Sequence, residues 1–141
     1  MTRLDDIHLW LNAVWGEGRL DLIKPLFVER AEAMGIMDGL NLGPDEFLEF
    51  VPAFRTHLRD MKISILRSFE AGDWVWTLLK VEGVATALGT PVAATGQLAM
   101  RFEGDKVAEA YNSFDAISIF EQLGMLPPET VALCLSGEKF G

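Results

Sequence analysis

A row of polar side chains in the last third of the chain is the part of the sequence best suited to chemistry. Residues 104–124 open with Gly-Asp, a pair typical of tight turns between strands. Because side chains alternate along a strand, four polar residues of the next segment share one face: Glu109, Tyr111, Ser113 and Asp115. A carboxylate at the end of such a row is a candidate general acid or base.

Asp115 has two possible roles, and both stay open at this point. In an apolar pocket, a desolvated carboxylate becomes a base able to take a proton next to a carbonyl. Directly before a helix predicted to begin at Ala116, the same side chain would instead cap that helix, a position where Asp is preferred.

Other polar residues near this strand are candidate ligand-binding groups. Tyr111 could orient a ligand oxygen through its hydroxyl, or pack half-buried against the first helix. Gln97 and Arg101 share one face of the preceding strand, where they could bind a ligand or belong to a solvated or dimer-facing row. Asn112 points to the opposite face from Tyr111, so we expect it in the pocket only if a bulge shifts the register.

The two histidines offer little for metal binding. His57 follows the third predicted helix and could serve as an alternative base if that helix lines the pocket. Neither His57 nor His8 has the neighbouring His, Asp or Glu spacing of a metal site. We therefore expect no metal and no cofactor, and the single cysteine excludes an internal disulfide.

Composition restricts the class of partner. The 141 residues, half of them hydrophobic, suffice for one domain with a core. A net charge of −9 and dispersed basic residues argue against binding nucleic acid or an anionic membrane. The sequence also lacks an apolar run long enough to span a bilayer and an uninterrupted signal-peptide core, so we expect a cytoplasmic protein that binds a small neutral or apolar ligand.

The elements that must position these groups follow from hydrophobic spacing. Apolar residues at helical spacing predict a helix over residues 2–15, a second over 20–28 and a third that begins at Pro44 and is kinked or divided at Pro52. Residues 29–43 read as a loop with one short strand. Alternation and turn signals predict four strands: 61–70, 74–84, 95–103 and 106–114. Helices followed by an antiparallel meander indicate an α+β fold, a curved sheet wrapped around three N-terminal helices.

Aromatic and sulfur-containing residues could form either the core or a hydrophobic cavity. The candidates for a cavity that holds a flat apolar ligand are Trp10, Trp15, Phe27, Met37, Phe54 and Trp76. Several strands are apolar on both faces, so one face should meet the helices and the other a second copy of the chain. This predicts a homodimer through the outer face of the sheet.

The order of these elements resembles the nuclear transport factor 2-like superfamily, and several motifs resemble its SnoaL-like polyketide cyclase group. Residues 15–21, Trp-Gly-Glu-Gly-Arg-Leu-Asp, are similar to that group's Trp-x-x-Gly-(Asn/Asp)-x-Asp opening. Residues 72–75 look like its Gly-Asp-x-Val turn, and Pro91 with Thr95-Gly96 looks like its Pro-x-Thr-Gly strand entry. Residues 104–115 and 122–124 are similar to its Gly-Lys-Ile-x-Glu-x-Trp-x-x-x-Asp and Gln-Leu-Gly close.

The resemblance implies a cone-shaped α+β barrel over residues 1–126, with an internal pocket. It also implies that Asp115 matches the aspartate that serves as general acid/base in the cyclases. Ala85 stands where the cyclases carry a histidine, so one polar partner of that chemistry is missing.

Two functions are therefore expected as alternatives. One is a cofactor-independent cyclase, isomerase or hydrolase that uses Asp115, and the other is a non-catalytic ligand-binding or assembly protein. Residues 127–141 are expected to form a tail that packs on the domain or on a dimer partner.

Overall fold

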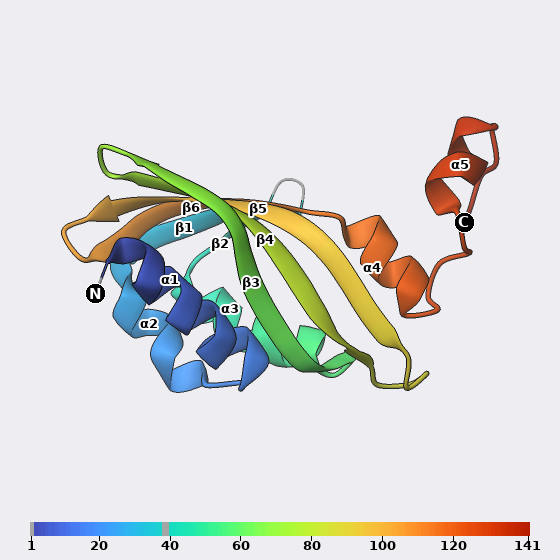
Figure 1. Ribbon diagram of the computed structural model, residues 1–141, viewed down its shortest axis with the longest axis horizontal. Helices are drawn as coiled ribbons and strands as arrows, with labels where there is room; N and C mark the ends of the chain where they lie inside the picture. Colours follow the sequence, from blue (N-terminus) through green and yellow to red (C-terminus); the bar gives the residue numbers. More distant parts are fainter. Residues whose placement is uncertain (1, 38–39) are drawn as a thin grey trace.

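A six-stranded sheet and a layer of helices on one of its faces make up the fold (Figure 1). The computed structural model describes residues 2–37 and 40–141, with the side chains of residues 36, 37, 40 and 41 left out of the description. The strands lie in the order β2-β1-β6-β5-β4-β3. Their bounds are β1 (Phe27–Met37), β2 (Leu40–Leu42), β3 (Leu58–Ala71), β4 (Trp74–Ala85), β5 (Pro91–Glu103) and β6 (Lys106–Phe114). The expected α+β cone, with its curved sheet around N-terminal helices, is confirmed.

The helices differ in detail from the prediction. They are α1 (Arg3–Leu11), a π-helical turn η1 (Asn12–Gly16), a 3-10 turn η2 (Leu20–Leu22), α2 (Ile23–Leu26), α3 (Pro44–Arg55), α4 (Ala116–Gln122) and α5 (Thr130–Leu135). The predicted second helix ends early, because the chain turns extended at Phe27 to enter the sheet. The predicted division at Pro52 is wrong, since α3 continues as one helix through this exposed residue in its last turn.

The first strand was the main element that the sequence did not predict at its full length. β1 runs parallel to β6 and pairs Ala33 with Ala110, so the sheet is mixed rather than purely antiparallel. This pairing joins segments far apart in sequence, which local alternation cannot reveal. The three hairpin-connected strand pairs β3-β4, β4-β5 and β5-β6 are antiparallel, as expected.

The first helix is fixed at both ends by side-chain hydrogen bonds. At its start, Thr2 and Asp5 form a reciprocal capping box. At its end, the Asn12 amide pairs with the backbone of Ile63 in β3: Nδ2 donates to the Ile63 carbonyl and Oδ1 accepts from the Ile63 N–H, each at 2.9 Å. Asn12 thereby satisfies part of the free edge of β3 and anchors the helical layer to the sheet.

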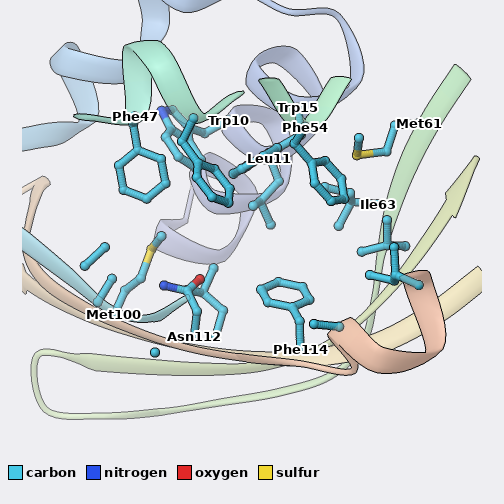
Figure 2. A pocket seen from close by; sticks show the side chains of 18 of the residues that line it. Trp10, Leu11, Trp15, Phe47, Phe54, Met61, Ile63, Met100, Asn112 and Phe114 are labelled. Carbon is cyan, nitrogen blue, oxygen red and sulfur yellow. The ribbon is translucent and has the colours of Figure 1, made fainter. Parts of the chain in front are cut away.

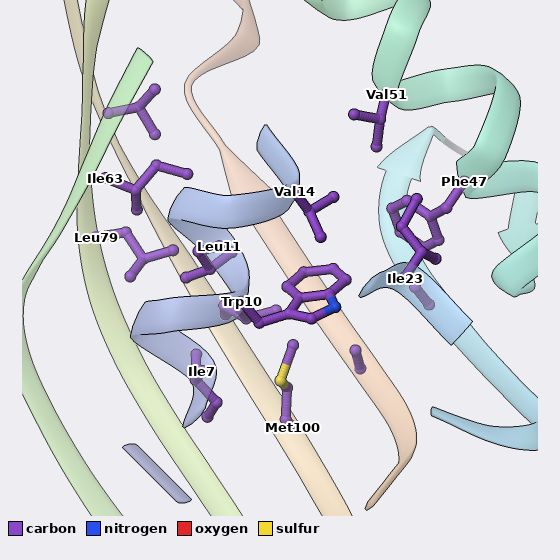
Figure 3. Packing of buried hydrophobic residues seen from close by; sticks show 14 of the residues in the cluster. Ile7, Trp10, Leu11, Val14, Ile23, Phe47, Val51, Ile63, Leu79 and Met100 are labelled. Atoms are coloured by element: carbon purple, nitrogen blue, oxygen red, sulfur yellow. The ribbon is translucent and has the colours of Figure 1, made fainter. Parts of the chain in front are cut away.

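The core lies between the helices and the concave face of the sheet. Ile7, Leu11 and Val14 come from α1 and η1 and belong to one buried cluster with Ile63 and Leu79 of the sheet (Figure 3). All five are buried. The core extends on the other side to Ile23, Phe47 and Val51, which brings α2 and α3 into the same cluster.

Helix α4 is tied to the sheet where β6 ends. The Gln122 side chain accepts from the N–H of Ala93 and donates to its carbonyl, each at 2.9 Å, so this amide takes the place of a neighbouring strand along β5. Helix α5 follows and extends away from the sheet (Figure 1). No helix within residues 2–37 and 40–141 is long and apolar enough to cross a membrane.

Candidate functional site

A cavity of about 260 Å³ lies between the helices and the sheet (Figure 2). Its helical wall is aromatic and aliphatic and consists of Trp10, Leu11, Trp15, Phe47, Phe50 and Phe54. The sheet wall is formed by Phe27, Ala33, Gly35, Met61, Ile63, Val81, Leu98, Met100, Ala110, Asn112 and Phe114. Ala116, Ile119 and Phe120 lie at one end of the cavity, and because Ala116 and Phe120 are exposed, we take this end as the one that faces solvent.

The aromatic wall is organised around Trp15. Its indole makes near-perpendicular contacts with the rings of Phe47, Phe50 and Phe54, at centroid distances of 6.3, 5.9 and 5.8 Å. Such edge-to-face contacts suit the charge distribution of aromatic rings. Trp15 belongs to the π-helical turn η1, a rare geometry that is often found at functional sites.

Asn112 is the one amide among the described residues of the lining, and a close approach of two strands positions it. Its Nδ2 donates to the Met34 carbonyl of β1 at 3.2 Å. The neighbouring Gly35 has φ +88°, and a Cβ at this position would overlap the backbone oxygen of Asn112. Glycine therefore permits β1 to lie against β6 here and permits the amide to reach Met34.

The described residues of the lining offer no group that titrates. Among its described residues, all side chains are hydrocarbon, thioether or aromatic except for Asn112 and the indole N–H groups of Trp10 and Trp15. The Trp10 N–H is already used, because it donates to the Leu22 carbonyl at 2.9 Å. The described part of the cavity thus provides hydrophobic contact and one amide, but no proton donor or acceptor of the kind needed for acid-base catalysis.

Asp115 lies outside this lining. Its carboxylate is exposed and caps α4, since Oδ1 accepts the Ser118 N–H at 3.1 Å. Its two neighbours Phe114 and Ala116 do line the cavity. Asp115 therefore lies close to the end of the cavity beside α4, while its side chain caps that helix. Ala85, which the sequence resemblance matches to a cyclase histidine, is the buried last residue of β4 and is not part of the lining either.

Four predicted ligand-binding residues lie on the outer face of the sheet, and this corrects their expected place in the pocket. The Trp76 indole donates to Gln97 Oε1 at 3.1 Å. Arg101 Nε donates to Glu109 Oε1 at 2.6 Å, and the Tyr111 hydroxyl donates to Glu109 Oε2 at 3.0 Å. The physical reason is alternation: their neighbours Leu98, Met100 and Ala110 are the residues that face inward.

The outer polar groups also shift one another's pKa values. The Arg101 guanidinium, followed by the Tyr111 hydroxyl, lowers the pKa of the Glu109 carboxyl by hydrogen bonding. The same carboxylate raises the pKa of Tyr111, because it accepts a hydrogen bond from the phenol and would repel a phenolate. Tyr111 therefore serves this outer network.

The remaining predicted residues divide as follows. Trp10, Trp15, Phe27 and Phe54 line the cavity as expected. His57 is exposed in the turn after α3 and outside the lining, while the side chain of Met37 falls outside the described residues. Within the described part of the chain, no group of three or more His, Cys, Asp or Glu residues is placed to hold a metal ion.

Sequence reasoning missed Asn112 although the alternation of β6 was correct. The error was to take the polar face, with Glu109 and Tyr111, as the pocket face. No bulge is needed within residues 109–114, because Ala110, Asn112 and Phe114 already face the cavity together. The signal that could have found Asn112 is a single amide on an otherwise apolar strand face.

Comparison with known structures supports the fold. A putative hydroxylase from Streptomyces galilaeus superimposes with a TM-score of 0.75 and 16% sequence identity, covering 94% of this chain and 88% of that one. A putative polyketide cyclase from Streptomyces antibioticus gives a TM-score of 0.73 at 19% identity, with 88% and 99% coverage. A protein from Catenulispora acidiphila with a ketosteroid isomerase-like fold gives 0.72 at 17% identity, with 84% and 92% coverage. Identities this low establish the fold alone.

Sequence comparison identifies the family. No curated protein matches the chain significantly. The model of the SnoaL-like domain matches residues 8–110, which include the aromatic wall of the cavity and most of the sheet. This match covers well over half of the chain, and together with the cone-shaped fold it shows that the chain belongs to the SnoaL-like domain family.

Proposed function

We propose that this protein binds a small, uncharged, hydrophobic molecule in the cavity. The observation that carries the proposal is the composition of the lining: aromatic and aliphatic walls, one amide and, among the described lining residues, no ionisable side chain. A cavity of about 260 Å³ lies just below the usual range for drug-sized ligands, which suits a molecule of two or three rings. A flat ring system would contact the aromatic wall on one side and the sheet on the other.

The same lining favours binding without chemistry over catalysis. Proton transfer requires a group that can gain or lose a proton within hydrogen-bond reach of the reacting atom. An amide and hydrocarbon side chains do not provide one. A ligand held here would be expected to be recovered chemically intact after long incubation with the protein.

Matched neutral and anionic ligands test the proposal. We expect 2-methylnaphthalene to bind, and 2-naphthoate to bind at least about a hundredfold more weakly, because a carboxylate in this cavity would lose water without gaining a cation. Isothermal titration calorimetry measures both affinities. Equal affinity for the two compounds, or no binding of the neutral one, would contradict the proposal.

A second candidate function is an enzyme that uses Asp115 as general acid/base. The observation in its favour is that Phe114 and Ala116, on either side of Asp115, both line the open end of the cavity. A ligand protruding from this end could bring a reacting atom to the carboxylate if the cap to Ser118 were released.

Asp115→Asn separates the two roles of this residue. Asn caps helices as well as Asp, so we expect the melting temperature to stay within about 2 °C of the wild type. Asn cannot accept a proton, so conversion of any substrate through Asp115 would be lost. Unchanged conversion in the variant would eliminate the enzymatic candidate, as measured by chromatography of the incubated compound.

We also propose that the protein forms a homodimer through the outer face of the sheet. An almost entirely apolar row crosses five strands there, through the paired residues Phe69, Trp76, Ala99, Tyr111 and Met34. Phe69 is 60% exposed and Tyr111 44% exposed, which is unusual for large aromatic side chains on a sheet. Sedimentation equilibrium at micromolar concentration should give twice the chain mass of 15.6 kDa, and a strictly monomeric protein would contradict the proposal.

A further inference from the structure

We infer that Asn112 Oδ1 is a recognition point of the cavity, and that the ligand is a neutral ring compound carrying a hydroxyl group that donates to it. This inference rests on the proposed function and specifies the chemistry of the ligand. It follows from three properties of the Asn112 side chain: its orientation, its unused acceptor and its apolar surroundings.

The orientation of the amide is fixed by the backbone of β1. A carbonyl oxygen only accepts hydrogen bonds, so the Met34 carbonyl requires Nδ2 of Asn112 on its side. Rotating the amide by half a turn would place Oδ1 against the Met34 oxygen, with two acceptors facing each other. The hydrogen bond to Met34 therefore uses Nδ2 and leaves Oδ1 as the atom of the amide that can accept from a ligand.

The Asn112 oxygen has no hydrogen-bond partner within the described part of the chain. Every fully buried side-chain nitrogen or oxygen among the described residues has a hydrogen-bond partner. Because the Asn112 oxygen has none there, it is not fully buried and is accessible to another molecule. Asn112 lines the cavity and its amide points toward the cavity interior in Figure 2. The free acceptor is thus available to a molecule inside the cavity.

The surroundings of this acceptor are apolar. Ala110 precedes it on the same face of β6, and Ala33 and Met100 lie beside Ala110 on the neighbouring strands; all three are at most 2% exposed. A hydrogen bond in such a setting is stronger than in water, and a ligand that displaces water here without donating leaves a buried acceptor unpaired. Sites of this kind discriminate against analogues that lack the hydroxyl.

The position of Asn112 along β6 indicates how the ligand would lie. It precedes Phe114, at the open end beside α4, by two residues, which corresponds to about 7 Å along a strand. A ring compound that enters beside α4 would reach Asn112 with its leading end. The hydroxyl would therefore lie at that end, and the rest of the molecule would lie between Phe114 and the aromatic wall.

Two probes of nearly equal size test the inference: 2-naphthol, which donates a hydrogen bond, and 2-methylnaphthalene, which does not. Both are titrated into the wild type and Asn112→Leu, whose side chain has the same branching and number of heavy atoms but no acceptor. We expect the substitution to lower the affinity for 2-naphthol about tenfold and to leave the affinity for 2-methylnaphthalene unchanged or increased. If both affinities change by the same factor, the inference is overturned while the proposed function stands. If neither probe binds the wild type, the proposed function fails as well.

A measurement on the wild type covers the case that Asn112→Leu does not fold after Met34 loses its donor. The side-chain carbonyl carbon of Asn112 is followed by NMR while each probe is added. Hydrogen bonding to Oδ1 should move this resonance downfield with 2-naphthol and not with 2-methylnaphthalene. The same small shift with both probes would overturn the inference.

Discussion

Ala110→Phe is expected to abolish binding of 2-methylnaphthalene, with at least about a hundredfold loss of affinity, while the protein stays folded. Ala110 is 1% exposed and lies in the middle of the sheet wall, beside Ala33 of β1 and Met100 of β5. A phenyl ring attached there would occupy the space that the ligand needs. A hundredfold loss corresponds to about 2.7 kcal/mol of binding free energy.

The fold should tolerate this substitution because the ring enters an existing cavity. Overpacking of a filled core typically costs about 1–3 kcal/mol, and filling empty space offsets part of that. Ser113→Phe is a suitable control, since Ser113 lies on the same strand and is exposed on the outer face. We expect this control to bind the ligand as the wild type does. Retained binding in a folded Ala110→Phe variant would show that the ligand binds elsewhere.

Gly35→Ala is expected to destabilise the protein by about 3–5 kcal/mol, the largest effect on stability that we predict. Two causes act together. The residue has φ +88°, a conformation that disfavours a side chain by about 1–2 kcal/mol. The added methyl group would also overlap the backbone oxygen of Asn112, so β1 would have to move away from β6.

Gly104→Ala separates these causes. Gly104 also has a positive φ, of +67°, but an added Cβ there meets no atom within 4 Å. This control should lose only about 1–2 kcal/mol. Urea unfolding of both variants measures the difference, which is the contribution of the close approach between β1 and β6. Equal losses in the two variants would mean that the strands do not approach each other as described.

The predicted fold was largely correct because its signals are local. Gly72 and Gly104 mark two hairpin turns, and the alternation of the segments that follow these glycines specified β4, β5 and β6 to within a few residues, apart from an earlier start of β5. The full extent of β1 was not predictable in this way. Its partner is β6, about 75 residues further along the chain, and the parallel pairing leaves no mark on the sequence of either strand.

The candidate site could be predicted only in part, for a related reason. The aromatic residues Trp10, Trp15 and Phe54 were found because they belong to two segments whose apolar spacing predicts helices, the first and the third. Alternation also placed Asn112 and Tyr111 on opposite faces of β6, but it could not show which face meets the helices. The orientation of the Asn112 amide depends on the Met34 carbonyl, a tertiary contact that only the folded chain reveals.

Asp115 shows how one residue type can satisfy a motif and a structural need at once. Its position after the last strand suggested the general acid/base of the cyclases in the sequence resemblance, and the same position is the N-cap of α4. A sequence motif identifies the position but does not say which partner the carboxylate takes. The structure supplies the Ser118 N–H as that partner.

The most direct test of the central claim is to locate a neutral ligand on the folded protein by intermolecular nuclear Overhauser effects. With 2-methylnaphthalene bound, contacts are predicted to the methyl groups of Ala110, Met100 and Ile63, all of which line the cavity. The competing site is the aromatic row on the outer face of the sheet. Contacts confined to Phe69, Trp76 and Tyr111 would contradict the claim that the internal cavity is the binding site.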